Sequence, residues 1–209
     1  MNTSPHARVR ITPATWITIS RLVGVFVFIL LLTYHTLELK QGSPDSAFRV
    51  WALGLFVVVA ATDFLDGWLA RRRGEVTPLG TFLDPVADKL LVVSSLIMLT
   101  KPSLPALSPQ FPVWFTWLVI SRDVYLFAGA VLVHATGAKL NIRPRQIGKL
   151  ATLLNLVVIA FVLGRVTGAA LNTSLFMAAI ATLWSWGQYT VDGLRQATLK
   201  DPSPPRNAF

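Results

Sequence analysis

Hydrophobic residues gather into six long runs along this chain, separated by short polar segments. The runs cover residues 22–37, 50–70, 85–100, 113–133, 147–163 and 166–191. A helix needs about 20 largely apolar residues to cross the hydrocarbon core of a bilayer. The pattern therefore predicts an all-α integral membrane protein with six transmembrane helices. The first, third and fifth runs are short, so their polar ends are expected to lie in protein or in a wet cavity.

Basic residues are distributed unevenly between the two ends of these runs. If the N-terminus is cytoplasmic, fifteen of the 19 lysines and arginines fall at cytoplasmic ends. The four on the opposite side are Lys40, Arg49, Lys101 and Arg165. Cytoplasmic loops of membrane proteins carry this excess of positive charge, so both termini are predicted to be cytoplasmic. Arg21, at the start of the first run, is expected to extend toward the interface.

Composition excludes some kinds of site and argues against one kind of partner. The chain is 53% hydrophobic and 14% charged, carries a net charge of +9 and has no cysteine. Disulfides and thiolate metal sites are therefore excluded. The basic residues are spaced between apolar runs rather than gathered on one polar face, which argues against a nucleic-acid partner. Loops that face an anionic lipid leaflet explain them better.

The chain shows no internal repeat and no linker long enough to divide it. We therefore expect a single membrane domain over residues 1–200, with a short interfacial segment over about residues 1–20. The polar, proline-rich residues 201–209 are expected to form a disordered tail.

Four of the ten acidic residues lie close together, three inside the second and third runs and one, Asp84, directly before the third. The pattern is Asp63-x2-Asp66-Gly67-x2-Ala70-Arg71-x8-Gly80-x3-Asp84-x3-Asp88. Carboxylates beside hydrocarbon are costly, so intramembrane acids indicate a functional site by default. In helices, the first two aspartates share one face and the last two share another. Two such helices place oxygen ligands around hard divalent cations, which predicts a metal site.

Glycine, proline and arginine residues in the same window indicate a diphosphate ligand. Gly67 and Gly80 lack side chains that would keep a ligand from the backbone, and Gly80 is expected in the connecting turn. Arg71 is suited to a bidentate phosphate contact. Pro78 is expected to break the helix between the two halves, and Pro85 to lie in the first turn of the third span. A purely structural role for the four aspartates is the alternative interpretation.

At these positions the chain resembles the CDP-alcohol phosphotransferases, whose signature it matches at every fixed residue. The resemblance covers about residues 21–163 and implies a six-helix membrane enzyme, usually a homodimer, that uses two Mg2+ or Mn2+ ions. Such enzymes transfer a phosphatidyl group from CDP-diacylglycerol to an alcohol and release CMP. The resemblance implies that the metal ligands are Asp63, Asp66, Asp84 and Asp88. It makes Asp88 the general base, and it assigns CDP-lipid binding to Asp66, Gly67, Ala70, Arg71 and Gly80.

Basic residues after the motif are candidates for binding the acceptor alcohol. They are Arg122, Arg143, Arg145 and Lys149. Cations near a metal site favour a phosphorylated acceptor or an anionic lipid. For Arg122 the alternative is an ion pair with Asp123 within the bundle, and for Arg143 and Arg145 it is ordinary positive-inside charge.

Three segments, 83–90, 120–122 and 148–152, resemble the branch that contains the phosphatidylglycerophosphate and cardiolipin synthases. The glycerophosphate enzymes usually carry glutamate where Asp123 stands and a second lysine where Ala151 stands. The resemblance places glycerol 3-phosphate first as acceptor, with phosphatidylglycerol as the alternative. An ion transporter and a membrane prenyltransferase are remoter possibilities, because neither a second related half nor a second separate acidic motif is present. A bacterial inner membrane, with the active site facing the cytoplasm, is the expected location.

Overall fold

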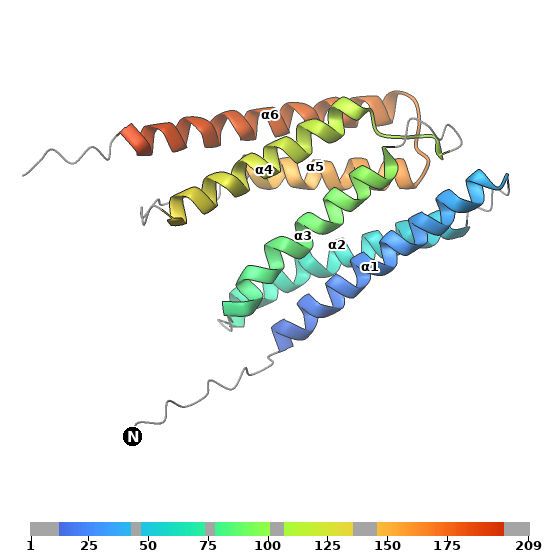
Figure 1. The fold of residues 1–209 in the computed structure, drawn as a ribbon, viewed down its shortest axis with the longest axis horizontal. Coiled ribbons are helices and arrows are strands. Elements are labelled where there is room, and N and C mark those ends of the chain that lie inside the picture. Colours follow the sequence, from blue (N-terminus) through green and yellow to red (C-terminus); the bar gives the residue numbers. More distant parts are fainter. Residues whose placement is uncertain (1–12, 43–46, 74–77, 101–106, 136–145, 199–209) are drawn as a thin grey trace, which may run out of the picture. The chain divides into compact units, whose positions relative to one another are not determined.

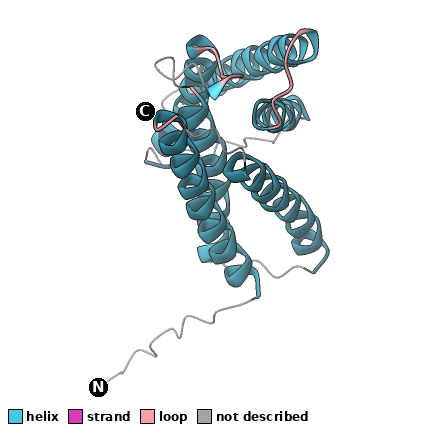
Figure 2. Cartoon of the chain, turned by 90° about the vertical axis from the view of Figure 1, so that its right-hand side faces the viewer, coloured by secondary structure: helices cyan, strands magenta, loops and turns pink. Residues whose placement is uncertain are grey.

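The computed structural model describes residues 13–42, 47–73, 78–100, 107–135 and 146–198, and these are mostly helical, with a few short loop segments (Figure 2). The six helices (Figure 1) are α1 (Pro13–Lys40), α2 (Ala47–Arg73), α3 (Pro78–Leu99), α4 (Val113–Ala135), α5 (Gln146–Leu163) and α6 (Ala169–Thr198). Side chains are described in these helices except at 13–18, 63–73, 78–88, 130, 132–135, 146 and 194–198. The prediction of an all-α chain with six helices is confirmed for this part of the protein.

Two helices begin earlier than the apolar pattern indicated. α1 begins at Pro13 rather than at Leu22, and α3 begins at Pro78 rather than at Pro85. Proline suits the first helical position because it has no N–H group to satisfy there. The expected first-turn position of Pro85 is therefore wrong, since Pro78 takes that place and Pro85 lies inside the helix. Hydropathy missed these turns because they contain polar residues that a helix accommodates at its ends.

One helical stretch among the described residues is long and apolar enough by itself to cross a membrane. It is Ile19–Lys40 in α1, with a mean hydropathy of 2.0. Shorter apolar stretches are Ala47–Thr62, Lys89–Leu99 and Ile147–Leu163. Length and composition therefore support one span directly in the described part of the chain, and the full set of six remains a prediction.

The described residues form two compact units. The first contains α1, α2 and α3 together with the segment Leu163–Arg165, and the second contains α4, α5 and α6. Contacts inside each unit do not decide whether the two form one domain, so the single domain over residues 1–200 remains a prediction.

In the first unit, α1 packs against both α2 and α3. Phe28 of α1 and Phe56 of α2 are buried with ring centroids 5.9 Å apart, and Leu96 of α3 is fully buried. Gly24 lies where α1 approaches α2 closely, because a Cβ atom at this position would come within 2.8 Å of Val59 Cγ2. A missing side chain thus sets the distance between the first two helices.

The first unit is also tied together by one buried arginine at the start of α2. The Arg49 side chain is 1% exposed and donates hydrogen bonds to four backbone carbonyls, three in the segment before α4 and one at the last residue of α5. These are the carbonyls of Leu107 (3.0 Å), Ser108 (3.2 Å), Pro109 (3.3 Å) and Leu163 (3.1 Å). Burial, and then the nearby charge of Arg165, lower the pKa of Arg49 to about 10. Arg49 precedes the expected second span and remains protonated at neutral pH.

In the second unit, α4 packs against α6. Trp114 contacts Phe176 with ring centroids 6.5 Å apart, and Tyr125 contacts Trp186 at 5.7 Å. Phe115, on the inner side of α4, is fully buried. These aromatic contacts hold α4 and α6 together along much of their length, which places the middle of α4 beside the middle of α6.

Candidate functional site

The acidic motif lies on the backbone of two consecutive helices. α2 carries Asp63 and Asp66 toward its C-terminal end, and α3 carries Asp84 and Asp88 in its N-terminal half. Residues three or four apart in a helix lie on one face. The helical spacing on which the metal-site prediction depends is therefore present in both helices, while the site itself remains a prediction.

The small and basic residues of the motif lie at the facing ends of the same two helices. Gly67, Ala70 and Arg71 belong to the last turns of α2. Gly80 belongs to the first turn of α3 and not to the connecting turn, which corrects the position expected for it. The first N–H groups of a helix have no acceptor within that helix, and they favour anionic ligands. Gly80 is thus at a helix end where phosphate oxygens are readily accommodated.

The side chains of the motif, from Asp63 to Asp88, fall outside the described residues. Among the side chains that are described, no group of three or more histidine, cysteine or acidic residues is placed to hold a metal ion. The motif's own donors are carboxylate oxygens, the ligands that Mg2+ and Mn2+ prefer. The residues thus fit a hard divalent cation by their chemistry and their helical spacing.

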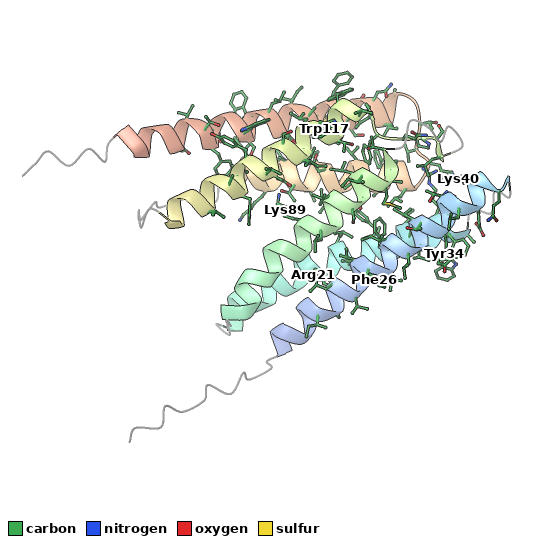
Figure 3. The ribbon with its side chains drawn as sticks, in the orientation of Figure 1. Arg21, Phe26, Tyr34, Lys40, Lys89 and Trp117 are labelled. Carbon is green, nitrogen blue, oxygen red and sulfur yellow. The ribbon has the colours of Figure 1, made fainter. Side chains whose placement is uncertain are left out.

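Two described cations of the first unit lie on α3 and α1. Lys89 follows Asp88 directly on α3 and is exposed (Figure 3). Arg21 belongs to α1, which packs against both motif-bearing helices, and it is 6% exposed. The expectation that Arg21 extends to the membrane interface is therefore wrong. No sequence pattern indicates this burial, because an arginine that precedes an apolar run looks the same whether it is buried in protein or extends to the interface.

Arg122 lies in the middle of α4, in the second unit, and is also buried. Its Nη1 is paired with Asp123 Oδ1 at 2.8 Å, and its Nη2 donates to Ser185 Oγ of α6 at 2.8 Å. The ion pair with Asp123, expected as the alternative for Arg122, is therefore present. The ion pair does not use all the donors of the guanidinium, because Arg122 Nε has no hydrogen-bond partner among the described groups. The part of Arg122 in acceptor binding remains a prediction.

The other acceptor candidates differ in what the structure says of them. Lys149 is exposed in the first turn of α5. Arg143 and Arg145 lie outside the described residues. Within the second unit, the described cations of the predicted acceptor site are therefore one buried guanidinium, partly neutralised by Asp123, and one exposed ammonium group.

α5 approaches α6 closely at the glycine before Lys149. A Cβ atom on Gly148 would come within 2.9 Å of the Tyr189 hydroxyl oxygen and 3.7 Å of Ser185 Oγ. Ser185 thus contacts the Arg122 guanidinium of α4 and lies against Gly148 of α5. Sequence reasoning missed Ser185 and Tyr189, because nothing in the local pattern of α6 shows which residues meet α4 or α5.

The chain is similar to known proteins over much of its length. Residues 11–186 match the family described as CDP-alcohol phosphatidyltransferase, a membrane-embedded and generally metal-dependent family. The chain is 34% identical over 145 residues to an Escherichia coli (strain K12) protein named CDP-diacylglycerol–glycerol-3-phosphate 3-phosphatidyltransferase. That alignment covers 65% of this chain and 74% of the relative. Relatives of the same name from Shigella flexneri and Shigella sonnei show the same identity and coverage.

Proposed function

The chain belongs to the CDP-alcohol phosphatidyltransferase family, and from this premise we propose that glycerol 3-phosphate is the acceptor of its reaction. As a member of this family it is a transferase of phospholipid biosynthesis, which moves a phosphatidyl group from a CDP-linked donor. CDP-diacylglycerol is the proposed donor. The product would be phosphatidylglycerophosphate, with CMP released.

The main support for glycerol 3-phosphate as acceptor is the Arg122 guanidinium, which keeps hydrogen-bond donors for a ligand. It is buried and anchored on two sides, yet Nε has no partner among the described groups. A guanidinium with free N–H groups in a fixed plane suits a phosphate oxygen. The similarity to relatives named for glycerol 3-phosphate supports the same choice. Arg143, Arg145 and Lys149 complete the proposed acceptor site.

Asp63, Asp66, Asp84 and Asp88 are proposed to hold two divalent cations, Mg2+ or Mn2+. When bound, these ions neutralise the diphosphate of the donor and favour departure of CMP. Gly67 and Gly80 would leave the backbone accessible to the cytidine diphosphate, Ala70 would line the same site, and Arg71 would contact a phosphate oxygen.

Asp88 is the proposed general base. Its carboxylate would accept the proton of the attacking hydroxyl from within about 2.6–3.2 Å, as general-base catalysis requires. The hydroxyl oxygen then forms a bond to the phosphorus that carries diacylglycerol, and the bond from that phosphorus to the CMP oxygen breaks. The proton remains on Asp88 until solvent removes it, so atoms and charges balance.

The proposed topology has six spans, with both termini and the active site on the cytoplasmic side of a bacterial inner membrane. Large apolar side chains on α4 and α6 support a membrane environment, because Trp117, Phe127 and Phe176 are exposed (Figure 3 labels Trp117). Such surfaces are unusual on soluble monomers. In a membrane they face lipid or a second copy of the chain, and a homodimer is proposed.

A second acceptor, phosphatidylglycerol, is favoured by one position on α5. Ala151 stands where glycerophosphate enzymes usually carry a lysine, and it is fully buried. A buried alanine provides no charge for a small phosphorylated acceptor. The activity would then be that of a cardiolipin synthase.

The deciding experiment measures CMP release from CDP-diacylglycerol by the purified protein with Mg2+. Glycerol 3-phosphate, phosphatidylglycerol, serine and inositol are compared as acceptors. Release that requires glycerol 3-phosphate and falls by about 10²–10⁴ in Asp88→Asn supports the proposal. Asp201→Asn, the same substitution in the C-terminal segment, is the matched control and should retain full activity. If folded, metal-loaded protein releases no CMP with any of the acceptors, the proposed reaction is contradicted and ion transport is favoured.

A further inference from the structure

We propose that Ser185 of α6 is a positioning residue that, together with Asp123, holds the Arg122 guanidinium in place for the phosphate group of the acceptor. The inference rests on the proposed function and deepens it, because it assigns a role to a helix that carries none of the predicted site residues. All the residues concerned belong to the second unit.

The two anchors hold different atoms of the guanidinium. Asp123 Oδ1 accepts from Nη1 and Ser185 Oγ accepts from Nη2, each at 2.8 Å. A planar group held at two corners can no longer rotate. Its Nε–H and one hydrogen on each terminal nitrogen remain for a ligand, since an arginine offers five N–H donors in a fixed fork. This leaves the donors that a bidentate phosphate contact uses.

The chemistry of the second anchor matters as much as its position. A serine hydroxyl accepts a hydrogen bond without bringing a negative charge, whereas a second carboxylate would cancel the attraction to a phosphate. Asp123 already offsets part of the positive potential of Arg122. Ser185 therefore orients Arg122 and preserves what is left of its positive potential.

Gly148 makes room for this anchor. A Cβ atom there would come within 2.9 Å of the Tyr189 hydroxyl oxygen and would also touch Ser185 Oγ. The distance to Ser185 Oγ would be 3.7 Å, which is ordinary van der Waals contact, so the steric conflict would fall on Tyr189, one helical turn from the serine. A glycine directly before Lys149 thus lets α5 approach α6 without disturbing the contact between α6 and α4.

Glycerol 3-phosphate and phosphatidylglycerol both present a phosphate group, so the test has two arms. Ser185→Ala is assayed as the full chain in lipid–detergent micelles, with each acceptor varied separately. We expect the KM for the true acceptor to rise about tenfold, as the loss of a hydrogen bond to a charged group predicts. The kcat should stay within about twofold and the KM for CDP-diacylglycerol should not change.

Two variants isolate the hydroxyl. Ser185→Thr keeps it and should restore most of the acceptor KM. Ser174→Ala makes the same substitution in α6, where the hydroxyl donates to Leu171 O of its own helix, and should change neither constant. A readout independent of catalysis is the rise in Tm produced by the acceptor alone, which should be smaller in Ser185→Ala than in Ser174→Ala.

An unchanged acceptor KM in active Ser185→Ala would overturn the inference and leave the proposed function intact. A fall in kcat and Tm with no change in acceptor KM would also overturn it, because Ser185 would then be only a packing residue. If wild-type protein releases no CMP with either acceptor, both the inference and the proposed function are overturned. An effect confined to the phosphatidylglycerol arm would support the inference and correct the acceptor.

Discussion

The four carbonyl contacts of Arg49 predict that this residue stabilises the first unit more than an ordinary surface arginine does. Arg49→Met retains most of the aliphatic side chain but removes all the donors to the four carbonyls. Each hydrogen bond contributes roughly 1 kcal/mol net. Burying the charged guanidinium costs free energy, and its removal in Arg49→Met offsets part of the lost hydrogen-bond stabilisation. We therefore expect Arg49→Met to lower the free energy of unfolding by about 2–4 kcal/mol.

The assay is thermal unfolding in detergent, followed by the fluorescence of the seven tryptophans. For a chain of this size the expected loss corresponds to a fall in Tm of about 5–15 °C. Arg49→Lys should fall between wild type and Arg49→Met, because one ammonium group cannot reach all the carbonyls that a guanidinium fork reaches. Lys40→Met, at the exposed end of α1, is the control and should cost less than about 1 kcal/mol. If Arg49→Met and Lys40→Met unfold at the same temperature, the reasoning from buried carbonyl contacts is refuted.

Two further predictions concern helix spacing and metal. Gly24→Ala should lower Tm because its Cβ would meet Val59 at 2.8 Å, while Gly54→Ala on α2, with nothing within 4 Å, should leave Tm unchanged or raise it. Equal shifts in these two variants would contradict the close approach of α1 and α2. Removal of divalent cations with EDTA should abolish CMP release, and Mg2+ or Mn2+ should restore it. Activity that persists after complete chelation would refute the proposed role of the four aspartates.

The sequence predicted the number of helices because long apolar runs have few alternatives to a helix. It failed at helix ends, where hydropathy and helix formation follow different rules. Gly80 and Pro85 were placed too early along the third helix because the polar turns after Pro78 were read as a connection. Proline at a first helical position was the better signal, and Pro78 satisfied it.

Contacts between distant residues were beyond the reach of the pattern. The alternative interpretation of Arg122, an ion pair with Asp123, is confirmed, since neighbouring charges can pair locally, and its acceptor role stays a prediction. Its second partner, Ser185, lies 63 positions away and is one of several serines in the chain. Similarly, the burial of Arg21 depends on how α1 packs against α2 and α3, and one run of residues does not contain that information.

The contacts of Arg49 also constrain the order in which the protein is assembled during synthesis. They join it to carbonyls 58 to 60 positions downstream and to a further one 114 positions downstream. When α2 leaves the ribosome, none of these acceptors has yet been made, so the guanidinium must stay hydrated at the membrane surface. It becomes fully satisfied only when α5 has been completed. A nascent chain that stops before Leu163 therefore keeps an exposed charge at the head of its second helix, and this distinguishes an unfinished chain from a finished one.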